Sequence, residues 1–168
     1  MAITNDKQLR MVILNDLNNI IDEVTGKLLK NLQESIQEHV YDAGTPAPVE
    51  LGGYERQKMN GGIQGSFETS TAVTMMGEFV EAWIEQDPMS MKLDMLRNIH
   101  GAYGQVPEDV RTILADLIID GTSWHRFGTG FWTEPRDFWE PFIQELDKNG
   151  NKFIEEAFKS RGIIYTKK

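Results

Sequence analysis

The chain has 168 residues, which suits a single domain of residues 1–168, and its 40% hydrophobic content is typical of a chain that folds around a core. It has no cysteine, which excludes disulfides, thiolate metal sites and a cysteine nucleophile. Its net charge of −9 disfavours DNA binding, because such binding depends on neutralising phosphates. No stretch approaches the roughly 18 apolar residues of a membrane span, so we expect a soluble, cytosolic product with no membrane partner.

The first predicted element is a long amphipathic helix from Asn5 to about Val40. Apolar residues recur through it at steps of three and four, capping oxygens precede it, and proline and glycine follow it. Gly26 marks a point where it could break. A continuous helix of this span is about 54 Å long at 1.5 Å per residue, longer than a small domain is wide. Two interpretations stay open: part of the helix projects to meet a neighbour, or all of it packs on its own domain.

The next segment, 43–62, is rich in proline and glycine and predicts an extended loop. We expect this loop to become ordered on assembly. Two strands follow, 65–74 and 78–86, with residues 75–78 as the turn between them. In the second strand Trp83 belongs to an alternation of exposed and buried positions.

Two further helices are predicted in the second half of the chain. Pro107 stands where a helix begins, and an apolar stripe continues to Asp120. The final helix runs from about Asp137 to Ser160, with a possible break at Asn149-Gly150, before a tail of residues 163–168. The predicted class is α+β: a small antiparallel sheet flanked by a long N-terminal helix and a C-terminal helix, with an additional helix near 107–120.

No motif with catalytic or metal-binding spacing is found. His39, His100 and His125 lack the partners of a metal site, so ordinary packing or surface roles are the better interpretation. The stretch from Asp147 departs from a calcium loop in the position of its glycine and in its twelfth residue, Phe158. The sequence therefore predicts no metal, no cofactor and no enzyme. A small hydrolase using carboxylates with His100 or His125 is the weakest alternative.

Large aromatic residues are concentrated between Trp124 and Phe142. Such residues favour cores and interface centres alike. Phe131-Trp132 lies in a connection flanked by glycine and proline, and aromatics in a loop indicate docking to a partner more than filling of an interior. Arg126 and Arg136 flank this pair with guanidinium groups suited to carboxylates of another subunit. A solvated loop is the alternative for these two arginines.

Two groups of residues carry a family resemblance. The first group is Tyr54-Glu55-Arg56 with the glycines up to Gly62 and then Ser66-Phe67-Glu68; the second is Arg126-Phe127-Gly128-Thr129-Gly130 and Glu134-Pro135-Arg136-Asp137-Phe138. Together they resemble the head-tail joining and tail-completion proteins of long-tailed bacteriophages, the neck and tail terminator proteins. The chain departs from the family at Arg56-Gln57-Lys58, where members typically have Arg-Thr-Gly, and in its inserted stretch 87–120.

The resemblance implies a structural virion protein with an α+β fold, assembled as a homo-oligomeric ring such as a hexamer. Such rings join head to tail, cap the tail tube, or belong to headless contractile particles. Implied partners are other copies of the chain and neighbouring neck, connector or tail-tube proteins, met in the host cytoplasm during assembly. DNA would pass through without specific binding, which suits an acidic ring.

The residues predicted at a subunit or partner interface have aromatic or guanidinium side chains and lie in or near the two motifs. They are Tyr54, Arg56, Trp124, His125, Arg126, Phe127, Phe131, Trp132 and Arg136. The alternative function is a soluble adaptor that pairs through its N-terminal helix. Irregular heptads in that helix disfavour a simple coiled coil.

Overall fold

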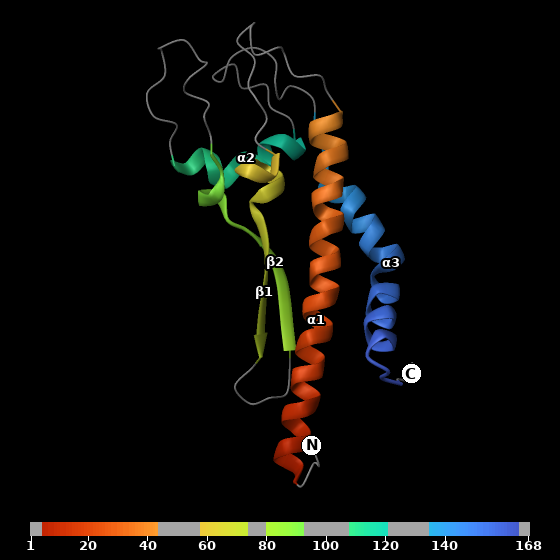
Figure 1. The fold of residues 1–168 in the computed structure, drawn as a ribbon. Helices are drawn as coiled ribbons and strands as arrows, with labels where there is room; N and C mark the ends of the chain where they lie inside the picture. The colour runs from red at the N-terminus through yellow and green to blue at the C-terminus, as the bar shows by residue number, and fades with distance from the viewer. Residues whose placement is uncertain (1–4, 44–57, 74–79, 93–107, 121–134, 165–168) are drawn as a thin grey trace, which may run out of the picture. The chain divides into compact units, whose positions relative to one another are not determined.

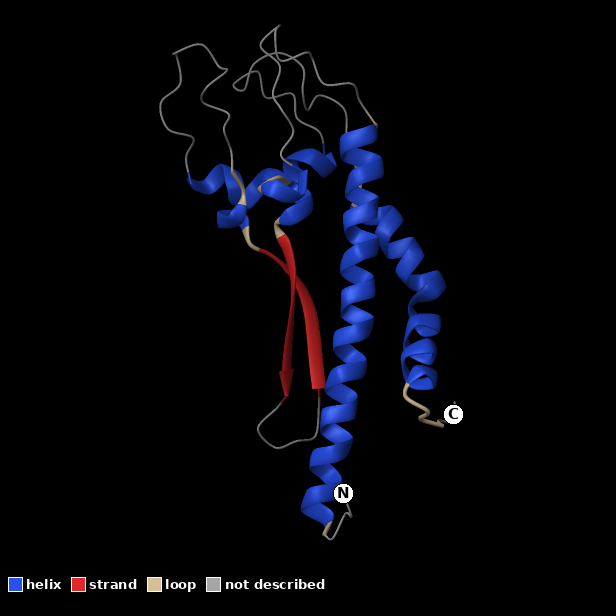
Figure 2. Cartoon of the chain, viewed as in Figure 1, coloured by secondary structure: helices blue, strands red, loops and turns tan. Residues whose placement is uncertain are grey.

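A computed structural model describes residues 5–43, 58–73, 80–92, 108–120 and 135–164 (Figure 1). These residues contain the helices α1 (Asp6–Ile36), α2 (Glu108–Asp120) and α3 (Trp139–Ser160). Strands β1 (Phe67–Val73) and β2 (Val80–Gln86) pair into a two-stranded sheet (Figure 2). The fold is therefore of the α+β class, with a small antiparallel sheet, a long N-terminal helix and a C-terminal helix, as predicted.

The described residues belong to two compact units, each assembled from segments that are far apart in the sequence. Unit 1 takes its residues from 1–30, 68–85 and 144–168, and unit 2 takes its residues from 31–67 and 86–143. Both α1 and α3 contribute one part of their length to each unit.

Helix α1 has the extent that its apolar periodicity predicts. Asn5 caps it, because its side-chain oxygen accepts the backbone N–H of Gln8 at 2.9 Å and so satisfies a donor of the first turn. The helix continues through Gly26 without a break and passes into a π-helical turn, Gln37–Asp42. The predicted end near Val40 lies inside this turn.

In unit 1, the C-terminal half of α3 packs on α1 through a small core. Ile20 and Val24 of α1 are buried against Ala157 of α3, with partly buried apolar residues around them: Leu28, Phe153, Phe158 and Ile163. Because alanine ends at its β-carbon, it lets the α1 side chains approach the backbone of α3.

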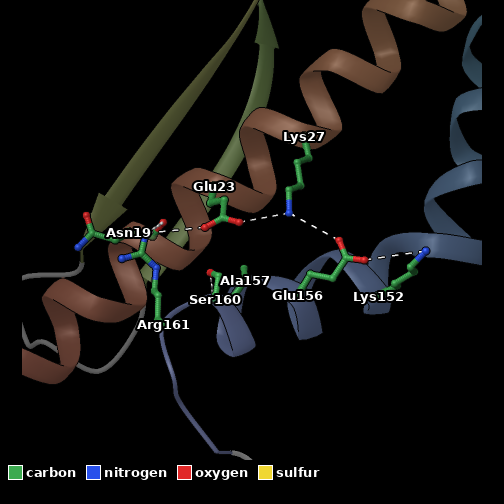
Figure 3. Close-up of polar contacts among 8 residues, drawn as sticks. All are labelled: Asn19, Glu23, Lys27, Lys152, Glu156, Ala157, Ser160 and Arg161. Atoms are coloured by element: carbon green, nitrogen blue, oxygen red, sulfur yellow. Dashed lines mark hydrogen bonds and ion pairs between the residues drawn. The ribbon is translucent and has the colours of Figure 1, made fainter.

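A chain of ion pairs borders the same core (Figure 3). Lys27 lies 3.2 Å from Glu23 and 3.8 Å from Glu156, which in turn lies 3.9 Å from Lys152. Arg161 extends the network to Glu23 and donates to the backbone oxygen of Asn19. All these side chains keep substantial contact with water, so each pair contributes only about 0–1 kcal/mol and the apolar contacts dominate.

Unit 2 holds most of the buried apolar side chains, and Phe138 is at their centre. Its ring is fully buried and meets Phe67 edge to face, with 6.3 Å between ring centroids. The backbone oxygen of Phe138 accepts the hydroxyl of Ser35 at 2.6 Å, so Ser35 is buried without an unsatisfied polar group. Other buried apolar side chains of unit 2 are Leu32, Ile36, Val40, Ile63, Met91, Leu114, Ile118 and Phe142.

The register of the sheet is given by the backbone bond from Asp87 N–H to the oxygen of Ser66, 2.7 Å, which places these residues opposite each other. Side chains along β2 alternate, with Trp83 and its glutamate neighbours exposed and the residues between them half-buried. This confirms the predicted alternation at Trp83. Ser70 donates to Glu85 across the strands, so the two residues lie on one face.

Both ends of α3 are capped by local sequence. Asp137 accepts the backbone N–H groups of Trp139 and Glu140, at 2.9 and 3.0 Å. At the other end Gly162, with φ of 66°, allows the chain to reverse while the N–H of Ile163 returns to the oxygen of Phe158. The helix continues past Asn149-Gly150 without a break. No described helix is long and apolar enough to cross a membrane.

Replacing Phe138 by alanine is expected to lower the free energy of unfolding by about 3–5 kcal/mol, because it empties a fully buried site. Urea titration followed by circular dichroism measures this loss. Trp139→Ala is the matched control, since it also deletes an aromatic ring but from an exposed neighbouring position. It should lower stability by roughly 1 kcal/mol, through its contact with Phe142. Equal losses in the two variants would contradict a Phe138-centred core.

Candidate functional site

Of the predicted interface residues, Arg136 lies within the described part of the chain. The others lie outside it: Tyr54, Arg56, Trp124, His125, Arg126, Phe127, Phe131 and Trp132. His100 also lies outside, whereas His39 is described. The predicted loop 43–62 is described at Ala43 and from Lys58 onward, and the tail 163–168 is described as far as Ile164.

Arg136 connects two elements of its own unit. Its backbone N–H donates to the oxygen of Ile118 in α2 at 2.8 Å, and its guanidinium Nη1 donates to the oxygen of Val40 at 3.3 Å. Val40 belongs to the π-helical turn after α1, where a main-chain oxygen can accept an external donor. The sequence predicted a carboxylate of another subunit as the partner of this arginine. The structure places its guanidinium on a carbonyl of the same chain.

The segment from Pro135 to Phe138 thus has a structural role in this chain. Arg136 and Phe138 both bond to residues at the end of α1, and Asp137 between them caps α3. Next to this contact, His39 Nδ1 lies 3.0 Å from the backbone oxygen of Ser35. The motif therefore anchors the start of α3 to the end of α1.

The turn from Lys58 to Gly65 is packed against the same region. The Nζ atom of Lys58 lies 5.7 Å from the centre of the Tyr41 ring, and a β-carbon on Gly62 would lie 2.5 Å from the Tyr41 hydroxyl. A β-carbon on Gly65 would lie 2.2 Å from the backbone oxygen of Met59. Glycine is therefore required at both positions by close contact, and of the two Gly62 belongs to the first motif.

These contacts form a common base, which we call the unit 2 base: Val40, Tyr41, Lys58, Gly61, Lys92, Ile118 and Arg136. Within it, Lys92 N–H donates to Gly61 oxygen at 2.7 Å, in addition to the contacts above. The undescribed segments 44–57 and 121–134 both begin and end near these residues in the sequence. The unit 2 base therefore fixes the attachment points of the two segments that carry the predicted interface residues.

A second candidate surface is the N-terminal end of α1 in unit 1. Leu9, Met11, Val12 and Ile13 keep between 43% and 57% of their surface exposed. Three of them continue the stripe that is buried at Ile20, whereas Met11 lies on the other side of the helix. We call these four residues the apolar end of α1.

Sequence periodicity included three of these residues in one stripe that continues to the end of the helix. Sequence periodicity could not show how much of this stripe α3 covers, because that depends on where α3 packs along α1. An apolar residue off the stripe, Met11, is the one sequence signal of an unusual exposed surface.

A third surface is the sheet, which carries no basic residue in either strand. Glu81, Trp83 and Glu85 are exposed on β2, and Glu68 is exposed on β1. The register places all four on one face, since Ser70 on that face bonds to Glu85. We call this face the acidic ribbon. Phosphates approaching it would meet only negative charge.

The described residues include no cluster of three or more His, Asp or Glu side chains suited to a metal ion. The carboxylates of the ion-pair network in unit 1 are bound to Lys27, Lys152 and Arg161.

Arg136→Met is expected to lower the free energy of unfolding by about 1–3 kcal/mol, because it removes a charged donor to a carbonyl at the unit 2 base. Guanidinium chloride unfolding monitored by tryptophan fluorescence measures this change. Arg111→Met on α2 is the matched control: Arg111 is half-buried and has no hydrogen bond or ion pair among the described residues. A control variant as unstable as Arg136→Met would contradict the anchoring role.

Comparison with protein-family models, with curated proteins and with solved structures finds no match to this chain. The similarity of its two motifs to the phage family therefore stays a resemblance, and the three surfaces described above provide the physical basis for a function.

Proposed function

We propose that the chain is a structural, non-enzymatic subunit of a ring, such as a hexamer, at the head-tail junction or tail end of a long-tailed bacteriophage. The sequence motifs at Tyr54–Gly62 and Arg126–Phe138 support this family, and the α+β fold with its long first helix is compatible with it. Its partners are other copies of itself and neighbouring neck, connector or tail-tube proteins in the virion.

The observation that carries the proposal is the apolar end of α1. Four neighbouring apolar side chains on a helix end are about half exposed in the single chain. Covering the exposed half of such a side chain contributes roughly 1 kcal/mol, so the three that share one side of the helix, Leu9, Val12 and Ile13, would together stabilise an association by about 3 kcal/mol. A protein that works alone gains nothing from this surface, whereas a subunit of an assembly buries it.

The acidic ribbon supports the second half of the proposal, a passage that DNA crosses without being held. Proteins bind DNA without sequence preference mainly by placing lysine and arginine against phosphates. Both strands lack these residues, and the chain as a whole carries −9. We propose that the acidic ribbon faces the passage in the assembled ring.

The soluble adaptor stays the alternative function, because the apolar end of α1 would serve a partner helix equally well. The two proposals differ in stoichiometry. A ring subunit forms a closed oligomer of one chain, alone or on its neighbouring virion proteins, whereas an adaptor forms a complex with one copy of a different protein. No described residue cluster favours a hydrolase.

Val12→Lys is expected to weaken assembly by about tenfold or more, because it places a charge in an apolar contact. Size-exclusion chromatography with light scattering measures the oligomer, alone and with neighbouring neck and tail proteins, and negative-stain microscopy shows whether it is a ring. Asn15→Lys is the matched control, since it adds the same charge on an adjacent turn at an exposed polar position.

Both variants should keep the helical circular dichroism of the natural chain, because neither position is buried. Assembly that is weakened equally by the two substitutions would remove the apolar end of α1 from the interface. A chain that stays monomeric with every neighbouring virion protein would contradict the ring itself.

Glu81→Lys combined with Glu85→Lys is expected to make the assembled ring retain double-stranded DNA about tenfold more strongly at low salt, with retention lost as salt rises. Filter binding across a salt series measures this. The control combines Glu38→Lys with Asp147→Lys, which changes net charge equally at exposed positions of other elements. Equal DNA retention by both double variants would contradict a ribbon that faces the passage.

A further inference from the structure

The chain contains two Asn-Gly dipeptides, Asn60-Gly61 and Asn149-Gly150. In this dipeptide the glycine nitrogen can attack the side-chain carboxamide of the preceding asparagine, because glycine has no side chain to obstruct the approach. Ring closure requires the backbone to leave the helical conformation. The surroundings of each pair therefore decide whether the reaction occurs in the folded chain.

Asn60 is in surroundings that permit the reaction. It is exposed at the end of the short 3-10 turn Lys58–Asn60. The next residue, Gly61, has φ of 111°, a conformation outside the helical region that glycine adopts readily. Asn60 is the last residue of a three-residue turn and Gly61 is already outside the helical region, so no long helix has to open, and Asn60 is exposed to water.

Asn149 is in surroundings that prevent it. It lies in the interior of α3, more than two turns from either end. Its side-chain amide donates to Glu145 Oε1 at 2.5 Å, one turn earlier, and Gly150 is buried. The helix must open locally before the nitrogen of Gly150 can reach the carboxamide, and such opening has a free-energy cost.

We propose that Asn60 is a spontaneous deamidation site of the native chain and that its reaction loosens the Lys58–Gly65 turn from Lys92. The nitrogen of Gly61 forms a bond to Cγ of Asn60, the Cγ–Nδ2 bond breaks, and ammonia leaves with the amide proton. Water then opens the resulting cyclic imide at one of its two carbonyls. The product is aspartate or isoaspartate, with one new carboxylate and no oxidation or reduction.

The turn has little room for the isoaspartate product, which carries one extra methylene in the main chain. Gly61 oxygen holds the N–H of Lys92 at 2.7 Å, and the side chain of Lys92 lies against Gly61, where an added β-carbon would be 2.7 Å from its Cγ. Gly65 is pressed against Met59 within the same turn. A longer backbone at residue 60 therefore displaces Gly61, and the bond to Lys92 is the contact that breaks.

This inference does not depend on the proposed phage function, because it follows from the dipeptide and its surroundings alone. It gives the unit 2 base a slow, irreversible change with age. The new carboxylate makes the chain one charge more negative at a turn that begins with Lys58 and contacts Lys92.

To test this, the full native chain is incubated in mildly alkaline buffer, and deamidation at both dipeptides is followed by tryptic peptide mapping with mass spectrometry. Asn60 should deamidate about tenfold faster than Asn149 or more, since each tenfold in rate corresponds to about 1.36 kcal/mol of protection. In the chain unfolded by urea, the two rates should agree within about twofold. Equal rates in the native chain, or a native Asn60 that does not react, would overturn the proposal.

Hydrogen exchange tests the structural consequence on the aged protein. The amide of Lys92 should exchange about fivefold faster in the isoaspartate form, which is the effect of losing a hydrogen bond worth roughly 1 kcal/mol. The Asn60→Gln variant has a longer side chain that closes the ring poorly, so its Lys92 amide should stay protected after the same incubation. Asn149→Gln is the matched control and should age like the natural chain. Unchanged exchange at Lys92 in the isoaspartate form would refute the loosening of the turn.

Discussion

The buried contact between Ser35 and Phe138 is the interaction on which unit 2 depends. Its hydroxyl-to-carbonyl bond joins residues 103 positions apart, and it brings the end of α1 to the start of α3. The ring of Phe138 then occupies the centre of the unit against Phe67, while Arg136, two residues earlier, bonds to Val40 and Ile118. Because the phenylalanine, the cap at Asp137 and the arginine are adjacent in sequence, one short segment positions three contacts at once.

This arrangement gives the two family-like motifs a physical meaning. The second motif ends in residues that anchor the chain, and the first contains Gly62, which lets the Lys58–Gly65 turn pack on Tyr41. Between the anchors run the segments that carry the aromatic and arginine residues predicted at an interface. In the described residues the motif ends hold the fold, whereas the apolar end of α1 and the acidic ribbon of unit 1 are exposed.

The energetics of the two units differ in kind. Unit 2 buries large side chains, so its stability responds to single core substitutions by several kcal/mol. Unit 1 joins α1 to α3 through a core centred on Ala157 and through ion pairs open to water, each worth little alone. The apolar residues at the start of α1 stay half exposed beyond this small core.

The sequence by itself determined the secondary structure. Three- and four-residue periodicity, capping residues and alternation predict α1, α2, α3 and both strands to within a few residues, because these signals are local. It left open whether the long helix projects to meet a neighbour or packs wholly on its own domain. Only the tertiary structure decided that Arg136 bonds to a carbonyl of its own chain, that Ser35 meets Phe138, and that the covering of α1 stops before Ile13. Those facts depend on contacts between residues about 100 positions apart or more, which no local pattern encodes.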